Sequence, residues 1–392
     1  MKRITLLTVV LLNLHFLFAH ELLDVASGTR HSLLLFDNGK ILPFGDNGHG
    51  QLGLSKNIDY QSISEENPLY IDTSENFISV AVGEDFSLAV SDDGTLWGWG
   101  NNHNYQLGLH SPENIEKPQL LTEIKGWKKV FAGGYESLAI KSDGTLWNLH
   151  NFEIIKNPNG TLWKDVNIYG EVWGWGDYTS IIVLQDIDNK FWVYGTCLDS
   201  LDNFSIINSF IDKETVCIDS ETILPIKISS DTTRFQVTDL SGIYQNKSDT
   251  VIFGLSVADD EKMKRIKEPV YDYLSGITVN EKSEKINEIV IGNFTDMLPR
   301  TSYLFQSQFE NNLSSYFQTY SALLQKNGKL VIYTNGKKMI SDGNIKIKKI
   351  FGGSNIFVQG KDLKIYGIGY FYAMFDHPEN VASFRYFIPI NF

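Results

Sequence analysis

Short apolar stretches and glycine-containing turns alternate along most of the chain. In one clear copy, the apolar residues 87–90 precede an Asp93-Gly94 step, and residues 96–100 return as Leu-Trp-Gly-Trp-Gly. Asp-Gly steps favour tight hairpin turns because a glycine adopts positive φ angles at little cost. Side chains alternate between the two faces of a strand, and here both faces carry apolar or small residues. The pattern predicts a β-hairpin with a two-residue turn, in a sheet that is packed on both faces.

The same unit recurs along the sequence. A single unit cannot bury both faces of its sheet, so neighbouring copies must stack on one another, and closing them into a ring leaves no long exposed edge. We therefore predict an all-β fold, a seven-bladed β-propeller. The seven copies lie near residues 23–54, 77–109, 127–150, 163–195, 226–254, 316–336 and 345–370.

The two chain ends provide a way to close such a ring. Residues 68–71 and 118–121 look like outer strands that follow the first two copies, and no such strand precedes the first copy. Residues 386–390, Tyr-Phe-Ile-Pro-Ile, have the composition of that missing strand. We expect them to complete the blade that begins at Leu23, so that the N- and C-terminal strands pair. Residues 258–315 have two readings, a projecting insertion or eroded strands of blades five and six.

The motif has a recognisable form. Between residues 80 and 108 it reads Val-x-x-Gly, Ser-Leu-Ala, Asp-Gly-x-Leu-Trp-x-Trp-Gly and Gln-Leu-Gly, which resembles the regulator of chromosome condensation repeat. The resemblance covers residues 23 to 200 well and residues 225–392 with gaps. It implies a β-propeller. The founding members of this family are nuclear nucleotide-exchange factors for a small GTPase, whereas other proteins with the fold are secreted enzyme inhibitors, so the fold leaves the function open.

The resemblance bears on one histidine. Family repeats often carry a histidine three residues after the repeat glycine. His31 fits this position, but Phe86 and Glu136 occupy it in the next two copies. We therefore expect a structural role for His31.

The charge of the chain argues against a nucleic-acid partner. The formal net charge is −13 at pH 7, and phosphate binding requires a basic surface. The main basic cluster is surrounded by acidic residues and is typical of a solvated loop. That cluster consists of Lys262, Lys264, Arg265 and Lys267.

Residues 1–19 are predicted to be a signal peptide. Lys2 and Arg3 precede an apolar run, and a cleavage site fits before His20. The run is short for a membrane span, although an uncleaved anchor is the alternative. We expect a secreted or periplasmic, monomeric protein with no membrane attachment after cleavage.

Two cysteines bear on the redox state of the chain. Cys197 and Cys217 are the only ones in the sequence. In an exported protein they could form a disulfide, and their spacing is equally compatible with two free thiols.

Catalytic, cofactor and metal motifs are missing from the sequence. We expect no catalytic residue, no cofactor and no metal site. His49, His103 and His110 could meet at a metal only if their loops lay on one face. Four aspartates recur at the predicted hairpin turns and are assigned to turn chemistry. They are Asp37, Asp92, Asp143 and Asp188.

Together these features favour an exported protein-interaction module that presents loops on one propeller face, for example as an inhibitor of an extracellular enzyme. Trp127, Trp163 and Tyr178 have two readings, interface anchors or blade-packing residues. One alternative function is an extracellular, carbohydrate-active enzyme with a site on the ring axis. Another, if the protein is not exported, is a guanine nucleotide exchange factor-like protein.

Overall fold

The described part of the chain contains β-strands, turns and one short 3-10 helix, η5 (Ser283–Lys285). None of its helices is long and apolar enough to span a membrane. The all-β prediction is therefore confirmed for these residues. The computed structural model describes residues 20–28, 30–54, 69–172, 178–194, 223–237, 241–254, 279–295, 317–334, 337–341, 346–353, 356–368 and 388–390.

The strands form seven antiparallel sheets, here called sheets 1 to 7 in chain order. Sheet 1 consists of β1 (Leu22–Ser27), β2 (His31–Phe36) and β3 (Ile41–Gly45). Sheet 2 consists of β4 (Phe77–Val82), β5 (Phe86–Ser91), β6 (Leu96–Gly100) and β7 (Ile115–Leu120). Sheet 3 consists of β8 (Trp127–Gly133), β9 (Glu136–Lys141), β10 (Leu146–Asn148) and β11 (Glu153–Ile155). Sheet 4 consists of β12 (Trp163–Val172), β13 (Tyr178–Asp186), β14 (Phe191–Tyr194) and β15 (Ile223–Pro225).

The remaining three sheets repeat this meander of consecutive neighbours. Sheet 5 consists of β16 (Arg234–Val237), β17 (Ser241–Gln245), β18 (Asp249–Gly254) and β19 (Val279–Lys282). Sheet 6 consists of β20 (Ile286–Thr295), β21 (Phe317–Gln325), β22 (Leu330–Thr334) and β23 (Lys337–Ile340). Sheet 7 consists of β24 (Ile347–Phe351), β25 (Ile356–Gly360), β26 (Ile365–Ile368) and β27 (Ile388–Ile390).

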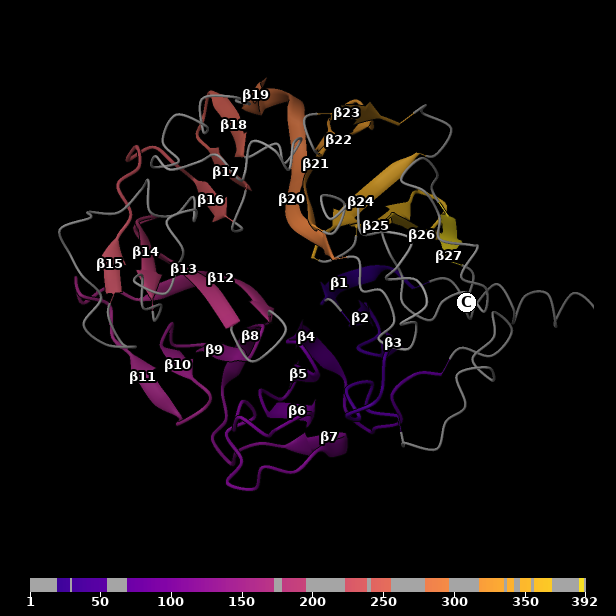
Figure 1. Cartoon of the computed structure of the whole chain (residues 1–392), viewed down its shortest axis with the longest axis vertical. Helices are drawn as coiled ribbons and strands as arrows, with labels where there is room; N and C mark the ends of the chain where they lie inside the picture. The colour runs from indigo at the N-terminus through magenta and orange to yellow at the C-terminus, as the bar shows by residue number, and fades with distance from the viewer. Residues whose placement is uncertain are drawn as a thin grey trace, which may run out of the picture.

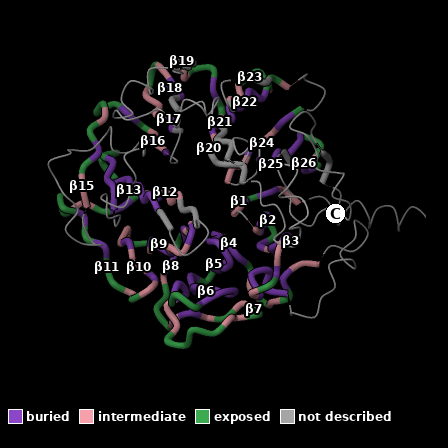
Figure 2. The backbone as a smooth tube through the Cα atoms, viewed as in Figure 1, coloured by how far each residue is buried: buried purple, intermediate pink, exposed green. Residues whose placement is uncertain are grey.

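The sheets follow one another around a common centre, and the first strand of each sheet lies nearest to it (Figure 1). Figure 2 shows mostly buried backbone along β4 and β5 and exposed segments along the outer strands β7 and β11. Inner strands are buried because both of their faces meet neighbouring sheets, whereas outer strands border on solvent.

The core consists of seven apolar clusters, and each one joins two successive sheets. Alternation along β2 shows how this arises. Leu33 and Leu35 pack against sheet 2, while Leu34 and Phe36 pack with Phe357 against sheet 7. Each sheet thus buries both faces, as the sequence pattern predicts, and the last sheet packs against the first.

The predicted pairing of the N- and C-terminal strands is wrong. β27 pairs with β26, with Ile390 opposite Ile365, and so completes sheet 7 rather than sheet 1. The edge of β3 already receives a hydrogen bond from within its own repeat, because Ile71 N donates to Ile41 O at 3.0 Å. The position that the C-terminal strand was expected to fill is therefore occupied.

The predicted two-residue hairpin turns at the Asn-Gly and Asp-Gly steps are also wrong, since three residues make the connection there. Gly39 N donates to Phe36 O, and Phe36 N donates to Lys40 O. This is a type I turn followed by a left-handed residue, and Gly39 supplies that residue with φ of 76°.

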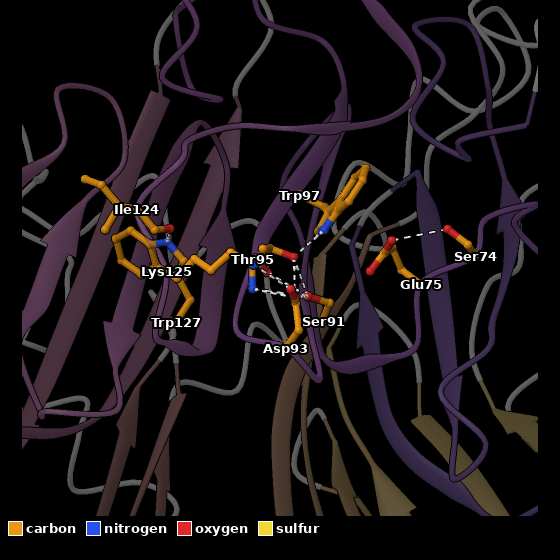
Figure 3. Close-up of polar contacts among 9 residues, drawn as sticks. All are labelled: Ser74, Glu75, Ser91, Asp93, Thr95, Trp97, Ile124, Lys125 and Trp127. Atoms are coloured by element: carbon orange, nitrogen blue, oxygen red, sulfur yellow. Dashed lines mark hydrogen bonds and ion pairs between the residues drawn. The ribbon is translucent and has the colours of Figure 1, made fainter.

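A polar network fixes the equivalent turn in sheet 2. The Asp93 carboxylate accepts hydrogen bonds from Ser91 Oγ at 2.6 Å, Thr95 Oγ1 at 2.7 Å and Lys125 Nζ at 2.8 Å (Figure 3). The hydrogen bond from Lys125 is the main reason why the pKa of Asp93 lies well below its usual range, and the hydrogen bonds from the Ser91 and Thr95 hydroxyls lower it further. This turn carboxylate therefore stays ionised at ordinary pH.

The four recurring aspartates lie at such turns, as expected. Asp143 accepts hydrogen bonds from the Thr145 backbone and hydroxyl. In the turns of sheets 1 and 2, the side chain that accepts the corresponding backbone hydrogen bond belongs to the residue after the recurring aspartate, which is Asn38 or Asp93. The other aspartates are Asp37, Asp92 and Asp188.

Part of the segment 258–315 consists of sheet strands. β19 pairs with β18 as the last strand of sheet 5, and β20 pairs with β21 as the first strand of sheet 6. The sixth repeat therefore begins at Ile286 rather than near residue 316. The basic cluster at residues 262–267 lies outside the described residues.

Candidate functional site

The seven sheets, arranged around a common centre, present two ends with different chemistry. The hairpin turns at residues 37–40, 92–95 and 142–145 lie at one end, here called the turn face. The opposite end, here called the loop face, holds the strand connections at residues 28, 30, 83–85 and 134–135, residues 46–54 after β3 and residues 101–114 after β6. Antiparallel pairing within each sheet dictates this division.

A charged cluster joins sheets 1 and 2 on the loop face. The Arg30 guanidinium lies 3.2 Å from Glu84 Oε1, 3.5 Å from Asp85 Oδ1 and 3.5 Å from Asp46 Oδ2. His49 Nε2 lies 3.8 Å from the other oxygen of Asp85. We call these five residues the loop cluster. Three carboxylates surround one guanidinium, so negative charge predominates in the loop cluster.

Electrostatics within the loop cluster favour the charged forms. Burial opposes the charge of Arg30, but Asp85, Glu84 and Asp46 outweigh it and raise the pKa of Arg30. The pKa of Tyr135, from the next sheet, is also raised, first by burial and then by the Glu84 and Asp85 carboxylates. The loop cluster therefore extends its negative potential across sheets 1 to 3.

His31 has the structural role that the sequence suggested. Its side chain is buried, and Nε2 lies 2.8 Å from Ser87 Oγ, which itself donates to Gln51 O. Since the serine proton is used in that second bond, His31 Nε2 is the donor and Nδ1 carries no proton. Nδ1 has no partner among the described residues. Burial lowers the pKa of His31 to about 3.

The other predicted histidines share the loop face but form no metal site. The rings of His49 and His103 meet edge to face, with centroids 6.4 Å apart. His110 lies on the loop that follows β6. Among the described residues, no three histidine, cysteine or acidic side chains are placed to hold a metal ion.

The aromatic residues considered as anchors are mostly core residues. Trp127 and Trp163 are 1% and 3% exposed, and their indole N–H groups donate to backbone oxygens of Ile124 and Ile155. These two tryptophans pack blades together and cannot serve as interface anchors. The Tyr178 side chain, Cys197 and Cys217 lie outside what the structure describes.

A second charged group lies around the axis at the turn-face end, here called the axial charge ring. Each member comes from the first strand of a different sheet. Lys129, Asp165 and Lys349 all act on Asp24, although burial is the main cause that raises the pKa of Asp24. The charges alternate in sign around the axis. The members are Asp24, Lys129, Asp165, Arg234, Glu288 and Lys349, and Ser79 takes this position in sheet 2.

One ion pair joins two members of the axial charge ring, and other members contact the backbone or residues of neighbouring sheets. Lys129 Nζ lies 2.7 Å from Asp165 Oδ1, and Glu288 accepts a hydrogen bond from Ile350 N at 2.7 Å. Lys349 Nζ lies 3.1 Å from Glu21 and donates to Leu22 O at 3.2 Å, which links sheet 7 to sheet 1. Side chains, rather than a shared strand, make this junction.

Comparison with models of known protein families matches the first part of the chain, which includes sheets 1 and 2. The model of the regulator of chromosome condensation (RCC1) repeat matches residues 38–90 and 93–140, and a second model with that description matches residues 23–51 and 77–106. Residues 23–140 of the chain contain regulator of chromosome condensation repeats.

The curated relatives of this repeat protein are much longer than the matched region. The mitochondrial RCC1 domain-containing protein RUG3 of Arabidopsis thaliana is 39% identical over 93 residues, which is 24% of this chain and 20% of RUG3. Human probable E3 ubiquitin-protein ligase HERC3 is 34% identical over 28% of this chain and 10% of HERC3. The dog X-linked retinitis pigmentosa GTPase regulator is 35% identical over 25% of this chain and 10% of its own length.

Solved structures resemble this repeat protein distantly. Saccharomyces cerevisiae Prp20p gives a TM-score of 0.48 at 16% identity, over 70% of this chain and 66% of that chain. Human WBSCR16 gives a TM-score of 0.40 at 14% identity, over 87% of this chain and 72% of that chain. Likeness at this level says nothing about function.

Sequence reasoning missed most of the loop cluster of this repeat protein. Only His49 was singled out, while Arg30, Asp46, Glu84 and Asp85 were not. A signal was present, because two acidic residues directly follow the repeat glycine Gly83, where the first copy has Thr29 and Arg30.

Proposed function

We propose that this repeat protein is an exported protein-interaction module whose loop face binds another protein. In this proposal the seven sheets are the blades of one closed propeller. The apolar cluster that joins sheet 7 to sheet 1 supports closure, and the side-chain contacts of Lys349 with Glu21 and Leu22 add to it.

The loop cluster is the observation that carries the binding proposal. It gathers three carboxylates from two sheets around one arginine, and Tyr105 on the same face is 47% exposed. Glu84 and Asp85 are 5% and 8% exposed, so their negative charge would act on a basic region of a partner protein from beneath the surface. Tyr105 would add an exposed aromatic contact on the same face, since aromatic and charged groups recur in interfaces. Relatives named as a ubiquitin-protein ligase and a GTPase regulator are consistent with a protein as the partner.

Export and inhibition complete the proposal. Residues 1–19 have the composition of a signal peptide, and blocking an extracellular enzyme is the specific form of binding that we propose. An axial enzyme is the weaker alternative. The axial carboxylates that such a site would use already accept hydrogen bonds, Asp24 from Val25 N, Asp165 from Val166 N and Glu288 from Ile350 N.

The test uses the full chain with its own leader and a C-terminal tag. A photo-crosslinking amino acid is placed at Tyr105 on the loop face or, as a control, at Ile154 on the outer strand β11, which is 45% exposed. We expect export, a mature N-terminus near His20, and a protein crosslink from Tyr105 only. Equal crosslinking from both positions would contradict the loop-face site. Retention of the intact chain in the cytoplasm would favour the exchange factor-like alternative.

A further inference from the structure

The opposite end of the ring carries a second exposed surface with different chemistry. In six of the seven first strands a β-bulge leaves one residue without a partner in the strand pairing. Bulges turn the extra side chain away from the regular pleat. These bulged positions form a rim just outside the axial charge ring, on the turn face. Their residues are Leu23, Ile78, Lys128, Lys164, Asn287 and Lys348.

Four neighbouring rim positions differ from the rest. Leu23 and Ile78 are 46% and 42% exposed, and Lys128 and Lys164 beside them are exposed as well. They come from sheets 1 to 4 in order, and β1, β4, β8 and β12 contact one another in that order. We call these four residues the rim arc. It sets two aliphatic side chains beside two lysines.

The repeats of the chain show that folding does not require this composition. The same rim position holds Asn287 in sheet 6 and Lys348 in sheet 7, and both are polar. A bulged residue that points to solvent packs against little, so a polar residue serves there as well as Leu23 or Ile78. Single exposed aliphatic residues are common on protein surfaces, but two at equivalent positions on adjacent blades form a patch.

The two lysines of the rim arc, Lys128 and Lys164, supply charge that the described residues do not neutralise. Lys128 has no hydrogen bond or ion pair with any of them, and Lys164 Nζ donates to the neutral amide of Asn189 at 2.7 Å. Just inside the rim, Lys129 is already paired with Asp165. In a chain of net charge −13, this is a local positive site next to an apolar one.

We propose that the rim arc is a docking site for a segment of a partner protein in which aliphatic side chains alternate with carboxylates. Leu23 and Ile78 would cover the aliphatic side chains, and Lys128 and Lys164 would pair with the carboxylates. Apolar contact supplies affinity in such a site, whereas charge complementarity supplies specificity and the rate of encounter. This site lies on the face opposite to the loop cluster and does not depend on it.

Fluorescence anisotropy of the full-length mature protein tests the proposal. The probe is a fluorescein-labelled peptide that alternates leucine and glutamate, and its uncharged counterpart alternates leucine and glutamine. Two variants alter the rim arc, Leu23→Ser with Ile78→Ser and Lys128→Glu with Lys164→Glu. The matched control changes the same residue types at the outer edge of sheet 3, Ile154→Ser on β11 with Lys156→Glu directly after it, where both side chains are exposed. Thermal melting checks that every variant folds.

We expect the leucine–glutamate peptide to bind, and each rim variant to weaken it about tenfold or more, while the control changes it less than about twofold. Added salt should weaken binding by screening the lysines. Failure of this peptide to bind, equal binding of the uncharged peptide, or equal effects of rim and control variants would overturn the proposal. So would rim-dependent binding to phosphatidylserine vesicles without peptide binding, which would indicate a lipid surface instead. Loop-face crosslinking at Tyr105 is measured separately and is unaffected by any of these results.

Discussion

His31 should make the stability of this protein depend on pH in a defined window. Its pKa falls from 6.5 in an unfolded chain to about 3 in the buried site. The unfolded chain therefore binds the proton first, so stability decreases as pH falls below 6.5 and stops decreasing near pH 3. The physical reason is local, because Nδ1 has no acceptor for the added proton among the described residues.

The size of this effect follows from the shift in pKa. Each pKa unit between the unfolded and the folded chain corresponds to ~1.4 kcal/mol, so the free energy of unfolding decreases by about 5 kcal/mol over the whole window. Between pH 7 and pH 5 it decreases by about 2 kcal/mol. Phenylalanine occupies the equivalent position in sheet 2, as Phe86. The variant His31→Phe therefore replaces the titrating group by a residue that the same fold already accommodates at the equivalent position.

Urea unfolding at pH 7 and pH 5 measures the difference directly. We expect the wild-type protein to lose about 2 kcal/mol more than His31→Phe over this interval, since the other titrating groups are common to both. The variant His103→Gln, at an exposed position on the loop face, controls for loss of one histidine. Identical losses in the wild-type protein and in His31→Phe would refute the reasoning.

Three further predictions concern packing, backbone and ring closure. Trp127→Ala should reduce the free energy of unfolding by ~3–5 kcal/mol in urea titrations, because this side chain is 1% exposed. Gly328→Ala should cost ~1–2 kcal/mol for its positive φ alone, whereas Gly45→Ala should cost more in the same assay, because a Cβ there would lie 2.4 Å from Arg30 O. Lys349→Met should speed hydrogen exchange in β1 relative to β5, because it removes the bond to Leu22 O; unchanged exchange would contradict this role.

The hairpin unit was readable from the sequence because it depends on local interactions. Glycine at positive φ, as at Gly39 and Gly94, and two-faced apolar alternation along each strand specify turns and sheets within one copy. Stacking follows from the need to cover both faces. The all-β fold and the structural role of His31 were therefore accessible without coordinates.

The placement of the terminal strand, the loop cluster and the axial charge ring required the tertiary structure. The C-terminal strand joined sheet 7 because β3 already accepts the Ile71 hydrogen bond, a contact that no local pattern reveals. Arg30 meets Glu84, and Lys349 acts on Asp24, although these residues are far apart in the chain. The sequence by itself determined the blades, because hydrogen bonds and side-chain alternation act over a few residues. Only the ring decided which charges became neighbours, because packing brings together residues from different repeats.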